Sequence, residues 1–123
     1  MRYLAIIEIE NAVGRGRAVA QWLEPRVDGD QTILRWLYVE PNGDSVVLRF
    51  CEAFDAPDSG TFDVLEFPPV DPDEPDGIVT NHSSVVAALE SAERVYGASA
   101  ERFLYSSMID AEYEAFAKRA RLI

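Results

Sequence analysis

The most distinctive chemical feature of this chain is a long segment that carries acidic side chains and no basic ones. Between Arg49 and Arg94 there is no Lys or Arg, yet eleven of the twenty-two carboxylates lie there. Carboxylates can bind a metal ion or a positively charged surface. Because like charges at this density repel one another and oppose folding, the segment indicates a cationic partner of some kind.

A calcium site is the first chemistry to test, and residues 71–77 (DPDEPDG) are the densest part of the segment. An EF-hand loop starting at Asp71 requires a ligand at its fifth position, glycine at its sixth and glutamate at its twelfth. Those positions hold Pro75, Asp76 and His82. The EF-hand is therefore excluded, and an irregular cation site is a weaker alternative to a loop that faces solvent or a partner. We expect no metal and no cofactor.

The remaining residues with catalytic potential stand alone in the sequence. His82 is the only histidine and Cys51 the only cysteine. His82 falls where a helix is expected to begin, which favours a capping or surface role, and Cys51 lies in an apolar run, which favours the core. The segment 14–17 (GRGR) lacks the Lys-Ser/Thr of a phosphate-binding loop and is interpreted as a turn. No catalytic residue is predicted, and we expect that the protein is not an enzyme.

A small-ligand site, including an enzyme active site, is the alternative. Four aromatic side chains are able to line a pocket between a sheet and its covering helices: Trp22, Trp36, Tyr38 and Phe50. Aromatic residues on sheets are usually core residues, so the core interpretation is preferred. An active site in this cleft would also need convergent polar groups, such as His82 with Tyr96 or Tyr105.

Length and composition describe one globular domain spanning residues 1–123, with 48% apolar residues and a formal net charge of −11. That charge argues against binding to nucleic acid or to anionic lipid, because both require a basic surface. A single cysteine allows no internal disulfide, and neither a signal peptide nor a membrane span is recognised. We expect a cytoplasmic protein, monomeric or weakly dimeric; ten Arg against one Lys favour a bacterial origin.

The first half of the chain predicts strands. The clearest signal is a hairpin in which Asn42-Gly43 supplies the turn, since both residues readily adopt positive φ. The apolar residues of 17–24 fit both the spacing of a helix and the alternation of a strand. Strand is preferred, because a helix this short would have marginal stability. The expected strands are residues 2–9, 17–24, 32–40, 45–54 and 61–67.

The C-terminal part predicts a cover for this sheet. Residues 68–81 contain four prolines and are expected to form an irregular crossover. A helix is expected from about Ser83 or Ser84 to Tyr96, with Asn81 or a serine as its N-cap and Gly97 as terminator. Two more helices are expected, over 100–108 and over 111–123, the latter with Asp110 as its cap. The predicted fold class is α+β: an antiparallel β-meander of four to five strands (residues 2–67) covered by two to three C-terminal helices (83–122).

In size, acidity and lack of catalytic motifs, the chain resembles the immunity proteins of bacterial toxin systems such as contact-dependent growth inhibition. The resemblance covers these general properties and no motif. It implies a cytoplasmic binding module that occludes a basic toxin domain, such as a nuclease.

The binding surface is expected where carboxylates lie beside apolar residues such as Phe67, Val70 and Ile78, because charge steers association and apolar anchors add affinity. An acidic surface that serves only solubility, or a homo-oligomeric scaffold protein, would be consistent with the same residues. The predicted partner-binding residues are Asp55, Asp58, Asp63, Glu66, Asp71, Asp73, Glu74 and Asp76.

Overall fold

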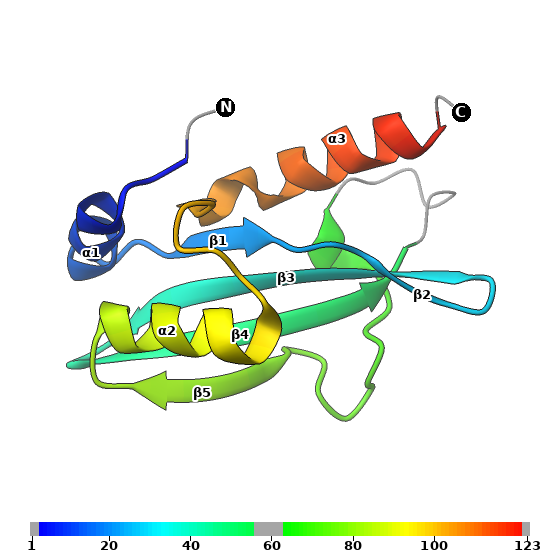
Figure 1. Ribbon diagram of the computed structural model, residues 1–123. Coiled ribbons are helices and arrows are strands. Elements are labelled where there is room, and N and C mark those ends of the chain that lie inside the picture. The colour runs from blue at the N-terminus through cyan, green and yellow to red at the C-terminus, as the bar shows by residue number, and fades with distance from the viewer. Residues whose placement is uncertain (1–2, 56–62, 122–123) are drawn as a thin grey trace.

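The computed structural model describes residues 3–55 and 63–121, which form a six-stranded antiparallel sheet with helices on both faces (Figure 1). The α+β class predicted from the sequence is therefore confirmed. The strands run in the order β5-β4-β3-β1-β6, and β2 also pairs with β3. The elements are α1 (Ile6–Gly14), β1 (Val19–Trp22), β2 (Arg26–Asp28), β3 (Gln31–Asn42), β4 (Ser45–Phe54), the 3₁₀ turn η2 (Val64–Glu66), β5 (Ile78–His82), α2 (Val85–Tyr96), β6 (Leu104–Tyr105), the 3₁₀ turn η3 (Ser106–Met108) and α3 (Ile109–Arg121).

The β3–β4 hairpin is the centre of the sheet and has the predicted position. Its strands pair without a break from Asn42↔Ser45 to Ile33↔Phe54. Gly43 turns the chain with a φ of 60°, a conformation that glycine adopts without steric cost. Residues 17–24 contain a strand, as preferred from the sequence: β1 pairs antiparallel with β3, with Trp22 opposite Trp36.

Two hydrophobic layers lie on opposite faces of this hairpin because side chains alternate along each strand. Leu37, Val39, Leu48 and Phe50 point to the face that α1 and α2 cover. The opposite face carries Leu34, Trp36, Cys51 and Ala53, and it packs against η2 and α3. In Figure 1, α2 crosses in front of the sheet while α3 runs beyond β1.

The first predicted strand is wrong, because residues 6–14 form helix α1. Its β-branched residues favour a strand locally, but Ile9, Ala12 and Val13 share one helical face and are buried against the sheet. The Glu8 side chain accepts a hydrogen bond from the Ala5 amide at 2.9 Å, which satisfies a free donor at the helix start. Tertiary burial thus outweighs the local strand propensity.

Residues 61–67 were expected to form a strand; residues 61 and 62 lie outside the described part, and the rest is irregular apart from η2. Asp63 caps this 3₁₀ turn by accepting from the Leu65 amide at 3.0 Å. Asp110, predicted to cap a helix, instead accepts a hydrogen bond from the Val64 amide at 3.1 Å. These two carboxylates accept hydrogen bonds from backbone N–H groups that a strand would donate to a neighbouring strand.

The predicted helix over 100–108 is also wrong. Leu104 and Tyr105 form β6 beside β1, and η3 follows. The free edge of β1 provides partners for their backbone groups, which an isolated helix of this length could not match in stability. Similarly, the crossover predicted for 68–81 is irregular only as far as Gly77, because residues 78–82 form β5 on the edge of β4.

The helix predicted to run from about Ser83 or Ser84 to Tyr96 is confirmed as α2, with Ser84 as its N-cap. The Ser84 hydroxyl accepts from the Ala87 amide at 3.1 Å, and Gly97 ends the helix in the left-handed conformation. The last predicted helix is confirmed as α3, although it begins at Ile109.

Gly77 is the residue that lets the chain turn tightly into β5. Its φ is +89°, and a Cβ at this position would lie 2.4 Å from the Phe50 carbonyl oxygen. We expect Gly77→Ala to lower the free energy of unfolding by about 3 kcal/mol, because it combines left-handed strain with a backbone clash. Urea denaturation measures this change.

Substitutions at Gly97 and Gly14 separate the cost of the left-handed backbone from the cost of the steric clash. Gly97 has a φ of +73° but open space around its Cβ position, so Gly97→Ala should cost only about 1 kcal/mol. Gly14 has neither constraint, and Gly14→Ala should be neutral or slightly stabilising. Equal costs at Gly77 and Gly97 would show that the close approach to Phe50 has no energetic importance.

Candidate functional site

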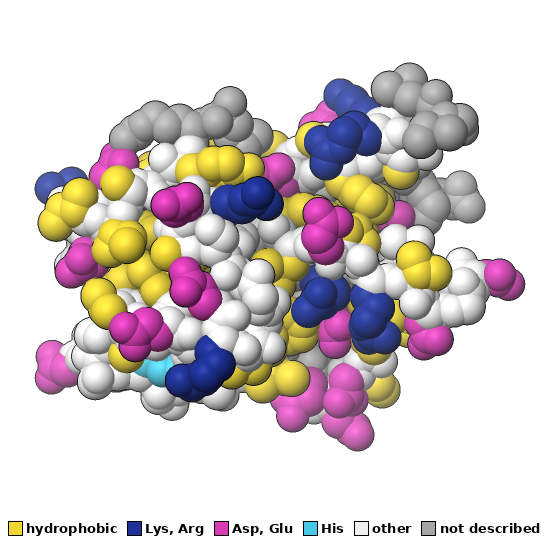
Figure 2. Space-filling model, viewed as in Figure 1, with side chains coloured by type: hydrophobic (Ala, Val, Ile, Leu, Met, Phe, Trp, Pro, Cys, Tyr) yellow, Lys and Arg dark blue, Asp and Glu magenta, His cyan; other side chains and the backbone are white. Residues whose placement is uncertain are grey.

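Four of the predicted binding residues lie on one exposed segment, which we call the acidic loop: residues 71–76, with Asp71, Asp73, Glu74 and Asp76. The acidic loop joins η2 to β5. In Figure 2, acidic side chains gather at the lower edge of the molecule, over this part of the chain.

Arg49 of β4 holds the acidic loop against the sheet. Its Nη1 donates to the Asp76 carbonyl oxygen at 2.9 Å, and its Nε donates to Glu40 Oε1 at 2.6 Å. The hydrogen bond to Glu40 raises the pKa of Arg49 further above its ordinary value, so the guanidinium stays charged. The sequence analysis did not identify Arg49. The only feature of the sequence that could have pointed to Arg49 is its charge, because it lies in an otherwise apolar stretch of β4, residues 46–51 (VVLRFC).

The acidic loop is also ordered from within. The Asp71 carboxylate accepts from the Asp73 amide at 2.9 Å, and successive turns bring the Glu74 amide to the Asp71 carbonyl and the Gly77 amide to the Glu74 carbonyl. Pro72 and Pro75 restrict φ inside the loop. These contacts restrict the backbone of the loop, which lowers the conformational entropy that binding would cost.

Among the described residues, no Lys or Arg forms an ion pair with a carboxylate of the acidic loop. The ion pairs of the described residues join Glu52 to Arg26 and Arg35, Glu40 to Arg49, and Glu114 to Lys118. None of them uses Asp71, Asp73, Glu74 or Asp76. A row of exposed, unneutralised negative charge attracts positively charged molecules from solution.

The structure separates the other predicted residues from this group. Asp55 accepts a hydrogen bond from the hydroxyl of the buried Tyr113 at 2.6 Å, and Asp63 caps η2, so both carboxylates are engaged within the chain. Glu66 is exposed on η2. Asp58 lies outside the described residues. Sequence reasoning thus found the acidic loop but did not distinguish binding candidates from carboxylates with structural partners.

A pocket of about 710 Å³ adjoins the acidic loop on the α3 face of the sheet. Trp36 and Tyr38 of β3 and Cys51 of β4 contribute to its floor. One wall comes from η2 and the acidic loop and the other from η3. Of the four aromatics considered as pocket residues from the sequence, Trp36 and Tyr38 line this pocket, Trp22 lines a separate one, and Phe50 is buried on the opposite face.

The polar groups on the pocket floor are held in their neutral forms. Burial raises the pKa of the Tyr38 hydroxyl to about 12, although its contact with the Trp36 indole acts in the opposite direction. Burial likewise raises the pKa of the Cys51 thiol to about 12, which makes it a poor nucleophile at neutral pH. The indole N–H of Trp36 is buried without a hydrogen bond of ordinary geometry in the described structure.

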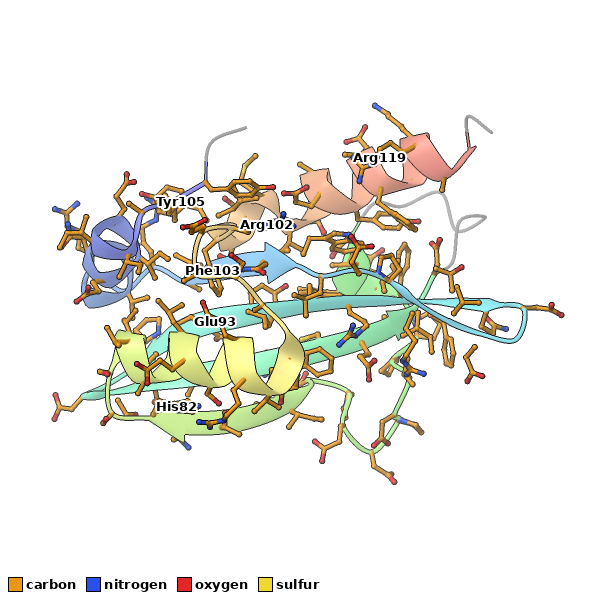
Figure 3. The ribbon with its side chains drawn as sticks, in the orientation of Figure 1. His82, Glu93, Arg102, Phe103, Tyr105 and Arg119 are labelled. Atoms are coloured by element: carbon orange, nitrogen blue, oxygen red, sulfur yellow. The ribbon has the colours of Figure 1, made fainter. Side chains whose placement is uncertain are left out.

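The groups suggested for an active site do not converge. His82 contacts the Thr80 hydroxyl at 2.9 Å, Tyr96 stacks on Phe50, and Tyr105 lies under the guanidinium of Arg17. Figure 3 shows His82 and Tyr105 on opposite sides of the molecule. The residues described also contain no cluster of three or more His, Cys, Asp or Glu placed to hold a metal ion.

Comparisons of this chain with protein-family models, curated proteins and solved structures found no match. None of the helices in the described ranges has the length and apolar character needed to cross a membrane.

The anchoring role of Arg49 leads to a prediction about loop order. We expect Arg49→Met to increase the amide exchange rates of Glu74 and Gly77 by about tenfold and to cost about 1–2 kcal/mol, because the loop loses its link to β4. Hydrogen exchange followed by NMR measures both residues. Arg26→Met, which breaks a surface ion pair outside the loop, is the matched control. If both variants change loop exchange equally, the anchor is not Arg49.

The raised pKa values predict how stability changes in alkali. Below pH 9 both states hold the Cys51 and Tyr38 protons. As pH rises from the ordinary value of 9.0 for Cys, and then 10.0 for Tyr, towards about 12, the unfolded chain loses protons that the folded chain keeps. Stability should therefore fall, with Cys51 accounting for about 1 kcal/mol by pH 10.

Urea midpoints measured from pH 7 to pH 10 test this dependence. Cys51→Ala lowers stability at every pH by leaving a cavity, but it should flatten the decline between pH 9 and 10. An unchanged slope in this variant would mean that the thiol is not protected from ionisation.

Proposed function

We propose that this protein is an acidic protein-binding module that covers a basic surface on a partner protein. The observation that carries the proposal is the acidic loop itself: four exposed carboxylates, without a salt bridge to any described Lys or Arg, on a segment anchored to β4. Repulsion between these carboxylates opposes folding of the free protein. A positively charged partner would relieve this repulsion and would be attracted by the same carboxylates.

The proposed mechanism is occlusion. Long-range attraction steers the basic surface towards the acidic loop, and exposed apolar side chains beside it supply short-range contact. Leu65 on η2 is 70% exposed, and Ile78 and Val79 at the start of β5 are 48% and 45% exposed. Because the loop is already ordered, the partner is covered without a large ordering cost.

A toxin domain, such as a nuclease, is the partner class that we propose. A nuclease needs a basic active site to bind phosphates, and an ordered row of carboxylates can occupy the same positions. The resemblance to toxin-immunity proteins in size and acidity agrees with this assignment, which would place the protein in the bacterial cytoplasm. A toxin gene next to the gene for this protein would identify the partner to be tested.

Charge reversal tests the role of the acidic loop. We expect the triple variant Asp71→Lys, Asp73→Lys, Asp76→Lys to lower the association rate with the basic partner by about tenfold and to weaken its salt dependence between roughly 50 and 500 mM. Surface plasmon resonance with the toxin domain encoded next to this protein measures both quantities.

The matched control reverses three exposed carboxylates elsewhere, with Glu10→Lys, Asp44→Lys and Glu90→Lys. Both triple variants change the net charge equally, so a simple net-charge effect would slow both. Equal rates for the two variants, or a loop variant that binds like the wild type at all salt concentrations, would rule out docking on the acidic loop.

A further inference from the structure

Strand β5 forms one border of the sheet, and its outer edge is open. In Figure 1, β5 lies along the lower border of the sheet, and within the described ranges its one strand partner is β4. Its residues are exposed except for the last, His82, which is half-buried. A border strand of this kind carries backbone N–H and C=O groups to which another chain can pair.

The hydrogen bonds at the end of β4 show which of its residues face β5. The Asp55 amide donates to the Thr32 carbonyl oxygen of β3 at 2.9 Å, whereas the Phe54 amide donates to the Pro68 carbonyl oxygen, also at 2.9 Å, on the opposite side. Backbone groups alternate between the two sides of an antiparallel strand. The even-numbered residues of β4 therefore direct their backbone groups away from β3 and towards β5.

The same alternation identifies the outward-facing groups of β5. Opposite the even-numbered residues of β4 lie Ile78, Thr80 and His82. The N–H and C=O groups of Val79 and Asn81 consequently point away from β4, and neither residue forms another backbone hydrogen bond with a described residue. A strand placed beside β5 would find two donors and two acceptors in line.

β5 lacks the features that usually prevent a border strand from pairing. Its sequence, IVTNH, contains no proline, lysine or acidic residue, and its pairing with β4 continues without a bulge. By contrast, β2, whose partner is β3, carries the charged residues Arg26 and Asp28. Ile78 and Val79 are 48% and 45% exposed and lie on opposite faces of β5, so an added strand would meet apolar surface on both faces.

The charges beside β5 indicate which kind of segment pairs with it. The acidic loop leads directly into the strand, since Gly77 alone separates Asp76 from Ile78. A second copy of this chain would bring a net charge of −11 and an acidic loop of its own, so repulsion opposes pairing between copies. Lys or Arg residues on an added strand would instead be attracted to the loop.

We propose that β5 pairs with an extended basic segment of the partner, which adds a strand to the sheet and places its Lys or Arg side chains beside the acidic loop. This inference rests on the proposed function and specifies the backbone conformation of the segment that docks. Hydrogen bonds to Val79 and Asn81 supply affinity through the main chain, and the acidic loop selects for positive charge.

Three blocked peptides test the inference without the natural partner. The first is Lys-Lys-Thr-Val-Thr-Lys-Lys, the second carries N-methyl groups on its three central residues, and the third has serine in place of every lysine. Each is titrated into ¹⁵N-labelled protein at low salt. The amides of residues 79 and 81 report on the edge of β5, and the amides of residues 73, 74 and 76 report on the acidic loop.

We expect the first peptide to shift the loop amides and to slow solvent exchange of both edge amides by about tenfold near saturation. It should bind about tenfold more tightly than the N-methylated peptide, which has the same charge but lacks the central backbone donors.

A proline on the edge of β5 provides the second arm. Val79→Pro removes an outward N–H and leaves the hydrogen bonds to β4 in place, so the variant should fold. Val27→Pro, the same change at an exposed position of β2, is the matched control. Val79→Pro should bind the first peptide only as tightly as the wild type binds the N-methylated one, whereas Val27→Pro should bind it like the wild type. If Val79→Pro does not fold, the comparison of the two basic peptides still decides.

The outcomes separate this inference from the proposed function. If the two basic peptides bind equally and only the loop amides respond, pairing with β5 is wrong and docking on the acidic loop stands. If neither basic peptide shifts the loop amides, or if the serine peptide binds as tightly as the first, the proposed role of the acidic loop is wrong, and the requirement for a basic segment fails with it. Light scattering tests the remaining occupant: a dimer that Val79→Pro dissociates would show that β5 pairs with a second copy instead.

Discussion

The register of the β3–β4 hairpin determines where nearly every other part of the molecule lies. Side chains alternate between the two faces of a sheet, so a shift of one residue would exchange the layer under α1 and α2 with the layer under α3. The turn at Gly43 and the apolar residues on both faces hold this register. Because of it, Arg49 lies opposite Tyr38 and Cys51 opposite Trp36, on the face where the pocket forms.

The acidic loop depends on the same register through two contacts made by β4. Arg49 reaches the Asp76 carbonyl oxygen, and Gly77 passes so close to the Phe50 carbonyl oxygen that no side chain fits between them. The anchoring side chain is thus itself positively charged and is neutralised by Glu40 rather than by the loop carboxylates. This arrangement orders the loop and leaves the carboxylates of Asp71, Asp73 and Glu74 directed to solvent, which is what a docking surface for a basic protein needs.

Sequence reasoning succeeded where a local signal and the tertiary environment agree. Asn42-Gly43 between two apolar runs indicates a hairpin, and Ser84 with Gly97 marks both ends of α2. It failed where they conflict. The β-branched start of the chain is a helix because Ile9, Ala12 and Val13 find an apolar surface under them, and residues 104 and 105 form a strand because β1 has a free edge beside them. The spacing of Ile9, Ala12 and Val13 also fits a helix, but the local sequence does not show which elements will find an apolar surface or a free strand edge beside them.

The sequence by itself determined the class of fold, the central hairpin, the last two helices and the concentration of negative charge between Arg49 and Arg94. Composition, turn residues and helix caps act locally, so they can be recognised without coordinates. Only the tertiary structure decided which carboxylates have partners: Asp55 and Asp63 accept hydrogen bonds from Tyr113 and Leu65, and Asp71 accepts one from the Asp73 amide. Among the described residues, no carboxylate of the acidic loop forms an ion pair. The tertiary structure also decided that a pocket lies next to that loop, because the pocket is formed by β3, β4, η2 and η3, which are distant in sequence and meet only when the sheet is complete.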